Sequence, residues 1–295
     1  MKNQITIWGG SGFIGSHVCD ILTKKNFKVI VADKKKSKYL IENQKMFIGD
    51  ITNTKDVLKS IKNSKYVYNF AGISDIEESN ADPLNVVKNN ISSNINLLEC
   101  CKKLRVKKYI YASTIYVYSQ YGGFYRCSKQ SAELFIKEYN KLYNLNYNIL
   151  RFGTVYGPRS DNRNAITRYI DSAIKNKLIN IKSKPDIIRE YIHVHDIAKM
   201  CLEILNKDYD NKDLIFTGSH HTRINDLITL ISEILNKKIK VKYLSNSKNS
   251  HYKVTPYSYQ NQLSEKLNLN SSTDLGQGLL HLIHHLKKSK RNYDD

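Results

Sequence analysis

The amino-acid sequence predicts an α/β fold built on a doubly wound parallel sheet, with a smaller C-terminal α/β lobe. Strand-like and helix-like segments alternate regularly through the first half of the chain, which is the rhythm of βαβ units. The run YVYNFAG (66–72) is apolar at odd and even positions alike, as expected of a central strand buried on both faces. With 295 residues, 41% of them hydrophobic, the chain can bury one large core or two linked ones.

The first half alternates between short β-branched or aromatic runs and longer amphipathic segments. The expected strands are Ile5–Trp8, Lys28–Ala32, Lys45–Ile48, Tyr66–Phe70, Lys108–Ala112 and Asn146–Leu150. The expected helices are Phe13–Lys25, Thr54–Ile61, Pro83–Leu104 and Gly123–Asn144.

The regular alternation breaks after FGTVYGPR (152–159), so we expect a second lobe to begin near Thr154. We therefore divide the chain into residues 1–153 and 154–295, with some elements of the second part crossing back to the first. The expected elements there are helices Asn164–Lys177, His195–Leu205 and Ile224–Leu235 and strands Ile187–His193 and Leu214–Gly218.

The formal net charge of +20 raises the question of a nucleic-acid partner. The lysines are scattered among asparagines and isoleucines rather than gathered in a stripe, so we interpret them as a solvated surface and expect no nucleic-acid binding. The five cysteines are odd in number and lack metal-ligand spacing, which favours reduced thiols. The sequence has no signal-peptide pattern and no apolar run of membrane-spanning length, so we expect a cytoplasmic protein without a membrane association.

Three glycines form G-x-x-G-x-x-G between the first strand and the first helix. Gly9 and Gly12 permit a tight turn and a close approach to a pyrophosphate, and Gly15 lets the helix pack on the strand. Asp33 ends the second strand, where a carboxylate accepts the ribose hydroxyls of NAD and repels the 2′-phosphate of NADP. The sequence therefore predicts a Rossmann-type domain that binds NAD.

A second group of residues carries acid–base chemistry. Tyr125 and Lys129 are four residues apart, which places them on one face of a helix. A lysine ammonium near a phenol favours the phenolate, so Tyr125 is a candidate general acid/base for a hydroxyl or carbonyl group. Ser113 and Thr114 end the preceding strand at the carboxyl edge of the sheet, where a hydroxyl can hydrogen-bond the same substrate oxygen.

With these motifs in this order, the chain resembles the extended short-chain dehydrogenase/reductase family, in its nucleotide-sugar epimerase and dehydratase branch. The resemblance runs nearly end to end. The matching segments are GGSGFIGSH (9–17), GDI (49–51), FAG (70–72), DPLNVVKNNI (82–91), STIYVYS (113–119), LRFGTVYGPR (150–159) and REYIHVHDIA (189–198).

The resemblance implies a role for each matching residue. Thr114, Tyr125 and Lys129 are the catalytic set. The cofactor contacts are Gly9, Gly12, Phe13, Ile14, Gly15, Asp33, Asp50, Ile51, Ala71, Gly72, Asn90, Tyr125 and Lys129. The substrate contacts are Ser74, Thr114, Thr154, Arg189 and His251, although Thr154 stands where the family has an asparagine.

The function implied is an NAD-dependent nucleotide-sugar epimerase that acts at C4 through a transient keto sugar. A 4,6-dehydratase is disfavoured because Ile115 and Tyr116 occupy the positions of that branch's Asp-Glu pair. The alternatives are a dehydratase that uses other acid–base residues, a keto-sugar reductase and, more remotely, a non-catalytic NAD-binding regulator. Only eleven positions separate Thr114 from Tyr125, which predicts a shorter loop over the sugar than in typical relatives.

The same resemblance implies a homodimer formed through the helices expected at Pro83–Leu104 and Gly123–Asn144. His281, His284 and His285 share one face of a C-terminal helix. We interpret that face as a solvent-exposed surface and expect no metal site.

Overall fold

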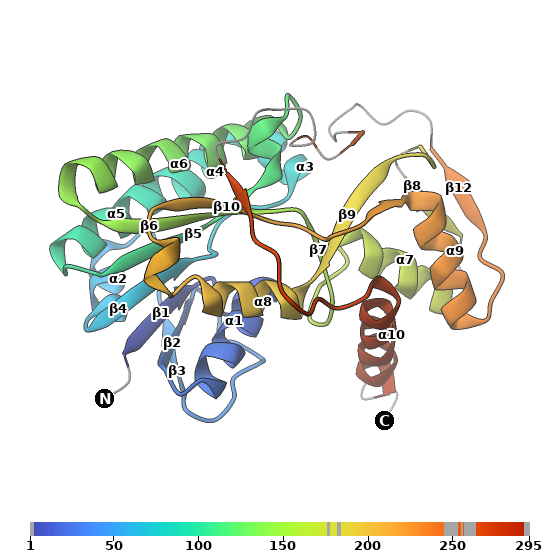
Figure 1. Ribbon diagram of the computed structural model, residues 1–295, viewed down its shortest axis with the longest axis horizontal. Coiled ribbons are helices and arrows are strands. Elements are labelled where there is room, and N and C mark those ends of the chain that lie inside the picture. Colours follow the sequence, from blue (N-terminus) through green and yellow to red (C-terminus); the bar gives the residue numbers. More distant parts are fainter. Residues whose placement is uncertain are drawn as a thin grey trace.

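The computed structural model describes residues 3–175, 178–181, 184–244, 253–254, 256 and 264–291. Its main feature is an eight-stranded sheet in the order β13-β10-β6-β5-β4-β1-β2-β3, with every neighbouring pair parallel (Figure 1). The strands are β1 (Gln4–Trp8), β2 (Lys28–Asp33), β3 (Gln44–Ile48), β4 (Ser64–Asn69), β5 (Lys108–Thr114), β6 (Asn146–Phe152), β10 (Lys212–Phe216) and β13 (Glu265–Lys266). The predicted doubly wound α/β fold is confirmed.

Helices cover both faces of this sheet, and each face has its own core (Figure 1). One face packs against α1 (Phe13–Lys24) and α8 (Val194–Glu203), which also contact each other. The other face packs against α2 (Thr54–Ile61), α5 (Ser93–Lys103) and α6 (Gly123–Tyr143). Parallel strands covered in this way are buried on both sides, which explains their continuous apolar character.

Local sequence signals set the helix boundaries. Asn53 caps α2 by accepting hydrogen bonds from the backbone N–H groups of Lys55 and Asp56. α6 ends at Asn144, which adopts a left-handed conformation with φ 54°.

The helix expected over Pro83–Leu104 is divided into three pieces, which corrects the prediction. α4 (Pro83–Val86) leads into a π-helical segment, Val87–Ser92, before α5 begins. A short helix that was not predicted, α3 (Ile76–Ala81), precedes them. The spacing of apolar residues does not reveal a π-helical turn, because the residues on both sides of it remain helical.

The second part of the chain builds a smaller unit around its own apolar core (Figure 1). β9 (Ile188–His193) pairs in parallel with β7 (Thr154–Tyr156) and antiparallel with β11 (His221–Arg223), and β8 (Ile179–Ile181) pairs with β12 (Val241–Tyr243). The helices of this unit are α7 (Ala165–Ile174), α9 (Ile224–Leu235) and α10 (Leu275–Arg291). β10 and β13 return to the large sheet. Among the described residues, no helix combines the length and apolar character that crossing a bilayer requires.

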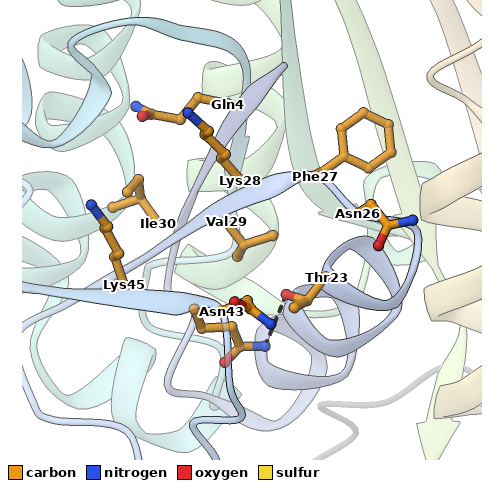
Figure 2. Close-up of a pocket in the computed structure, with 10 residues that line it drawn as sticks. Gln4, Thr23, Asn26, Phe27, Lys28, Val29, Ile30, Asn43 and Lys45 are labelled. Carbon is orange, nitrogen blue, oxygen red and sulfur yellow. Dashed lines mark hydrogen bonds between the residues drawn. The ribbon is translucent and has the colours of Figure 1, made fainter. Parts of the chain in front are cut away.

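A cavity of about 630 Å³ lies at the amino ends of β1, β2 and β3 (Figure 2). Gln44 donates a hydrogen bond to Thr23 inside it, and Lys28 and Lys45 lie on its wall. Open α/β sheets bind ligands at the carboxyl ends of their strands, at the opposite edge. We therefore locate the active site elsewhere.

Candidate active site

The glycine turn is shaped by close contacts between backbones. Gly9 has φ +76°, and a Cβ there would lie 2.6 Å from the backbone nitrogen of Ala71. A Cβ at Gly15 would lie 2.3 Å from the carbonyl oxygen of Gly9. Gly12 is the N-cap of α1 and provides no side-chain cap, so the N-terminus of the helix is left for another acceptor. This cradle suits a pyrophosphate held by backbone N–H groups.

Asp33 lies at the end of β2 beside the glycine turn. One carboxylate oxygen accepts a hydrogen bond from the backbone N–H of Ser11 at 3.1 Å, and the other accepts from that of Lys35 at 3.2 Å. Lys34 extends instead toward Asp50, with Nζ 3.5 Å from its carboxylate. The carboxylate of Asp33 is thereby held at the place where a ribose diol would bind.

The predicted contacts after β4 lie next to α6. Gly72 has φ +145°, and a Cβ there would lie 2.7 Å from Oδ1 of Asn90. Asn90 is buried in the π-helical segment; its Oδ1 accepts from the backbone N–H of Ile73 at 2.7 Å, and its Nδ2 donates to Ser128 Oγ at 3.0 Å. Asn90 therefore joins the loop that follows β4 to the helix of Tyr125 and Lys129. π-helical turns of this kind are frequent at functional sites.

The structure brings the end of β5 and the first turns of α6 together. Thr114 is the last residue of β5, and Tyr125 and Lys129 occupy the beginning of α6. Nζ of Lys129 lies 5.9 Å from the centroid of the Tyr125 ring and donates to the carbonyl of Ala112 at 2.7 Å. All three predicted catalytic side chains are buried in the protein. Burial lowers the pKa of Lys129 to about 8, and the negative charge of Glu133 opposes this shift.

The short connection between Thr114 and Tyr125 is compact. It begins with a 3₁₀ turn over Ile115–Tyr118 and ends at two glycines with positive φ, Gly122 and Gly123. A Cβ at Gly123 would lie 2.1 Å from Oδ1 of Asn80, an atom that also accepts from the backbone N–H of Phe124. The glycines therefore allow α3 to lie against the start of α6, which closes the connection in few residues.

The tyrosines of this connection pack against apolar side chains, and the hydroxyl of Tyr118 also accepts a hydrogen bond from Arg151 at 2.5 Å. Tyr116, Tyr118 and Tyr121 lie against an apolar cluster made by Ile115 and Ile215. The edge of the Tyr116 ring also faces Tyr125, with ring centroids 6.4 Å apart.

A buried ionic network below this face was not predicted. Glu133 lies one turn beyond Lys129 on α6 and accepts a hydrogen bond from Ser113 Oγ at 2.5 Å. Arg151, on β6, forms ion pairs with both Glu133 and Asp213. The spacing of Tyr125, Lys129 and Glu133 at i, i+4 and i+8 could have indicated a shared helix face, but nothing local indicates the arginine from another strand.

The predicted substrate contacts come from separate elements. Ser74 is exposed in the loop between β4 and α3. Thr154 starts β7 and pairs with Tyr191, two residues beyond Arg189 on β9, so these two strands of the small sheet are neighbours. The guanidinium of Arg189 donates to the backbone carbonyl of Ile188 at 2.9 Å. His251 lies outside the described residues.

Comparisons with known proteins identify the family of the chain. The family model described as "NAD dependent epimerase/dehydratase family" matches residues 5–216. A UDP-glucuronate 4-epimerase of Thermodesulfobacterium geofontis is 28% identical, with 96% of each chain covered. The solved structure of a UDP-N-acetylglucosamine 4-epimerase from Methanobrevibacter ruminantium is 27% identical, covers 98% of this chain and 100% of its own, and gives a TM-score of 0.85.

A UDP-glucuronic acid 4-epimerase from Bacillus cereus, solved with UDP-glucuronic acid and NAD, is 25% identical with a TM-score of 0.84 and covers 97% of this chain and 99% of its own. The glycine turn, the carboxylate at the end of β2 and the Tyr/Lys pair are thus found in a chain that matches one family over most of its length. The protein belongs to the NAD-dependent epimerase/dehydratase family.

Proposed function

We propose that the protein is a UDP-sugar 4-epimerase that uses NAD. The observation that carries the proposal is the position of Tyr125 and Lys129, which share one face of α6 next to the carboxyl end of β5. The relatives named above are 4-epimerases of UDP-glucuronate and UDP-N-acetylglucosamine, which supports a uridine diphosphate sugar as the substrate class.

Tyr125 is the proton carrier of the proposed reaction. Its phenolate takes the proton of the C4 hydroxyl and later returns a proton to the C4 oxygen. Lys129, with a pKa of about 8, is largely protonated at neutral pH, and its ammonium stabilises that phenolate. The hydroxyl of Thr114 donates to the C4 oxygen and orients it. When bound, NAD would supply the acceptor and donor of the C4 hydride, and return of the hydride to the opposite face of the keto sugar would leave no net redox change.

The cofactor contacts proposed are the residues of the glycine turn with Phe13 and Ile14, the carboxylate of Asp33, and the segments after β3 and β4. Gly9, Gly12 and Gly15 leave room and backbone N–H groups for the pyrophosphate, and Asp33 accepts the adenosine ribose hydroxyls. The remaining contacts are Asp50, Ile51, Ala71, Gly72 and Asn90.

The substrate contacts proposed are Ser74, Thr114, Thr154, Arg189 and His251. The planar guanidinium of Arg189 suits a diphosphate, because it presents several donors to phosphate oxygens at once. Ile115 is buried and apolar, so this chain lacks the carboxylic acid that a 4,6-elimination requires at that position. This favours epimerisation over dehydration.

We also propose a homodimer formed through α6 and the segment from α4 to α5. Large apolar side chains are exposed on these elements: Leu84, Val87, Phe124, Leu134, Phe135, Leu142 and Tyr143. An apolar surface of this kind is typical of an interface.

The test is mass-resolved chromatography of the protein with NAD and, separately, UDP-glucose, UDP-glucuronate and UDP-N-acetylglucosamine. A new peak of unchanged mass, approached from either epimer, is the expected result. A product lighter by one water would identify a dehydratase instead, and turnover only with a keto sugar and stoichiometric NADH would identify a reductase. If NAD binds but none of the three UDP sugars reacts, the proposed UDP-sugar epimerase is overturned, and a reductase of a keto sugar or a non-catalytic NAD-binding protein takes its place.

A further inference from the structure

Three histidines from two distant parts of the sequence meet where the small unit joins α8. His193 is the last residue of β9, His195 lies in the first turn of α8, and His281 lies in α10. The ring centroids of His193 and His195 are 4.7 Å apart, and those of His193 and His281 are 5.8 Å apart. One ring nitrogen from each residue lies within 4.8 Å of the other two.

We propose that His193, His195 and His281 form a binding site for one divalent transition-metal ion, with Zn²⁺ as the best match. Imidazole nitrogens are preferred ligands of Zn²⁺, Cu²⁺ and Ni²⁺, whereas Mg²⁺ and Ca²⁺ prefer oxygen ligands. A histidine with an ordinary pKa of about 6.5 is mainly neutral at pH 7.5 and can offer a lone pair. Three protein ligands with a fourth position left to water is a common arrangement for zinc.

The distances require only a small adjustment. Zinc–nitrogen bonds of about 2.0–2.1 Å place tetrahedral ligand atoms roughly 3.4 Å from one another, so the nitrogens must approach by about 1.4 Å at most. His195 and His281 are exposed and can turn to do this. His193 is 1% exposed and is fixed by its surroundings, so it provides the rigid ligand.

Gly278 allows the helix that carries His281 to come close to His193. A Cβ at Gly278 would lie 3.0 Å from Cδ2 of His193 and 2.0 Å from the hydroxyl of Tyr156. Gly278 lies three residues before His281, so α10 approaches His193 on the face that carries His281. Any larger residue at Gly278 would push α10 away from this histidine.

The hydrogen bonds of His193 leave a nitrogen for the metal. Its buried Nε2 has no hydrogen-bond partner among the described residues, and Nδ1 accepts from the backbone N–H of His195 at a long 3.3 Å. If Nε2 binds the metal, the ring proton moves to Nδ1, which can then no longer accept from the N–H of His195. If Nδ1 binds the metal, the metal takes the place of that N–H. Either choice sacrifices one weak hydrogen bond for a metal–nitrogen bond.

Nearby charges partly balance one another. The positive charges of Arg159 and Lys199 repel a cation near His195. The carboxylate of Asp196, which is adjacent to His195 and 2% exposed, attracts it. The bound ion would join α10 to the junction of β9 and α8. We therefore expect it to stabilise the fold rather than to take part in the sugar chemistry.

The test is a Zn²⁺ titration of the full chain with NAD bound, after treatment with EDTA and without an oligohistidine tag, in competition with a chromogenic chelator. The expected result is one Zn²⁺ per chain, with the dissociation constant raised at least about tenfold in His281→Ala. His284→Ala is the matched control, because His284 is exposed on the same helix and lies outside the cluster; it should bind as the wild type does.

Two further readouts separate a built site from surface binding. Zn²⁺ at 100 times its dissociation constant should raise Tm by about 5 °C in wild type and His284→Ala, with little change in His281→Ala. Co²⁺ bound to the wild type should give a visible absorption band with the intensity typical of tetrahedral coordination. The His281→Ala variant should lack this band. The proposal is overturned by a stoichiometry well below one, by wild-type affinity in His281→Ala, or by equal losses in both variants.

Discussion

Glu133 and Arg151 form a bidentate ion pair below the proposed catalytic face of α6. Nε of Arg151 donates to one carboxylate oxygen of Glu133 at 3.1 Å, and NH2 donates to the other at 2.6 Å. The same carboxylate accepts from Ser113 Oγ, the residue before Thr114. One buried carboxylate therefore links the end of β5, the middle of α6 and β6, the three elements that hold or support the proposed catalytic residues.

Glu133→Gln should lower the free energy of unfolding. It should also move the alkaline decline of kcat/KM to lower pH. Breaking a buried ion pair by neutralising one partner costs about 3–5 kcal/mol of the free energy of unfolding, since Asp213 is then the one charged partner of Arg151 among the described residues. Glu133 also opposes the lowering of the Lys129 pKa, so its loss should let that pKa fall below about 8. Lys129 then loses its proton at lower pH, and the alkaline limb of the kcat/KM profile moves in the same direction.

Urea denaturation and a pH–rate profile measure these two effects. Glu138→Gln, an exposed change on the same helix, should alter neither. A destabilised Glu133→Gln variant with an unmoved alkaline limb would mean that Glu133 supports the fold without influencing Lys129.

Sequence reasoning could identify the parts of the site whose members are close along the chain. The glycine turn and the Tyr125/Lys129 pair are local patterns, and the strand that delivers Thr114 is delimited by its own composition. The alternation of strands and helices likewise predicted the parallel sheet, because each βαβ unit is a local signal.

The remainder depends on contacts between distant segments. Arg151 meets Glu133 only because β6 lies beside β5 and faces α6, and His193 meets His281 only because α10 folds back 88 positions later. The sequence places His281, His284 and His285 on one face of α10, whereas the structure groups His281 with residues of β9 and α8. The short strands β7, β8, β11, β12 and β13 were not predicted either. A strand of two or three residues is too short to show an alternation of apolar and polar side chains.

Tyr125→Phe should remove most of the activity and leave the fold intact. The change deletes only the hydroxyl that carries the proton, and such a group contributes about 10²–10⁴ to the rate. We expect kcat to fall by that factor while NAD content and the denaturation midpoint stay close to wild type. Tyr143→Phe, near the end of the same helix and half exposed, is the control and should retain full activity. Retention of more than about a tenth of wild-type kcat in Tyr125→Phe would contradict the proposed acid–base role.

Leu134→Glu should convert the proposed dimer into a monomer. Leu134 is 66% exposed on α6, a helix that also exposes Phe135 and Leu142, and a buried unpaired carboxylate at an apolar interface is strongly unfavourable. Sedimentation velocity at micromolar concentration measures the change. Ile48→Glu is the control, because Ile48 is 59% exposed on the edge strand β3. A wild-type protein that sediments as a monomer would remove the proposal altogether.

The protein should lose stability as the pH falls below about 6.5, and His17 should account for part of that loss. His17 is buried in α1 and its Nε2 lies 3.0 Å from the carbonyl oxygen of Pro158, to which the neutral ring donates. Burial lowers the pKa of His17 to about 3, and burial likewise lowers that of His193 to about 4. Between these values and the unfolded pKa of 6.5, the unfolded chain binds protons that the folded chain does not.

The free energy of unfolding therefore decreases on acidification through this range, by up to about 1.4 kcal/mol per pH unit for each histidine. His17→Gln keeps a donor for Pro158 but cannot titrate, so its dependence on pH between 6 and 4.5 should be shallower by about that amount. Urea denaturation at several pH values, with EDTA present to exclude metal effects, gives the comparison. The exposed change His284→Gln should leave the slope of the wild type unaltered. An equal slope in His17→Gln and wild type would mean that the His17 ring takes up its proton in the folded protein as readily as in the unfolded chain.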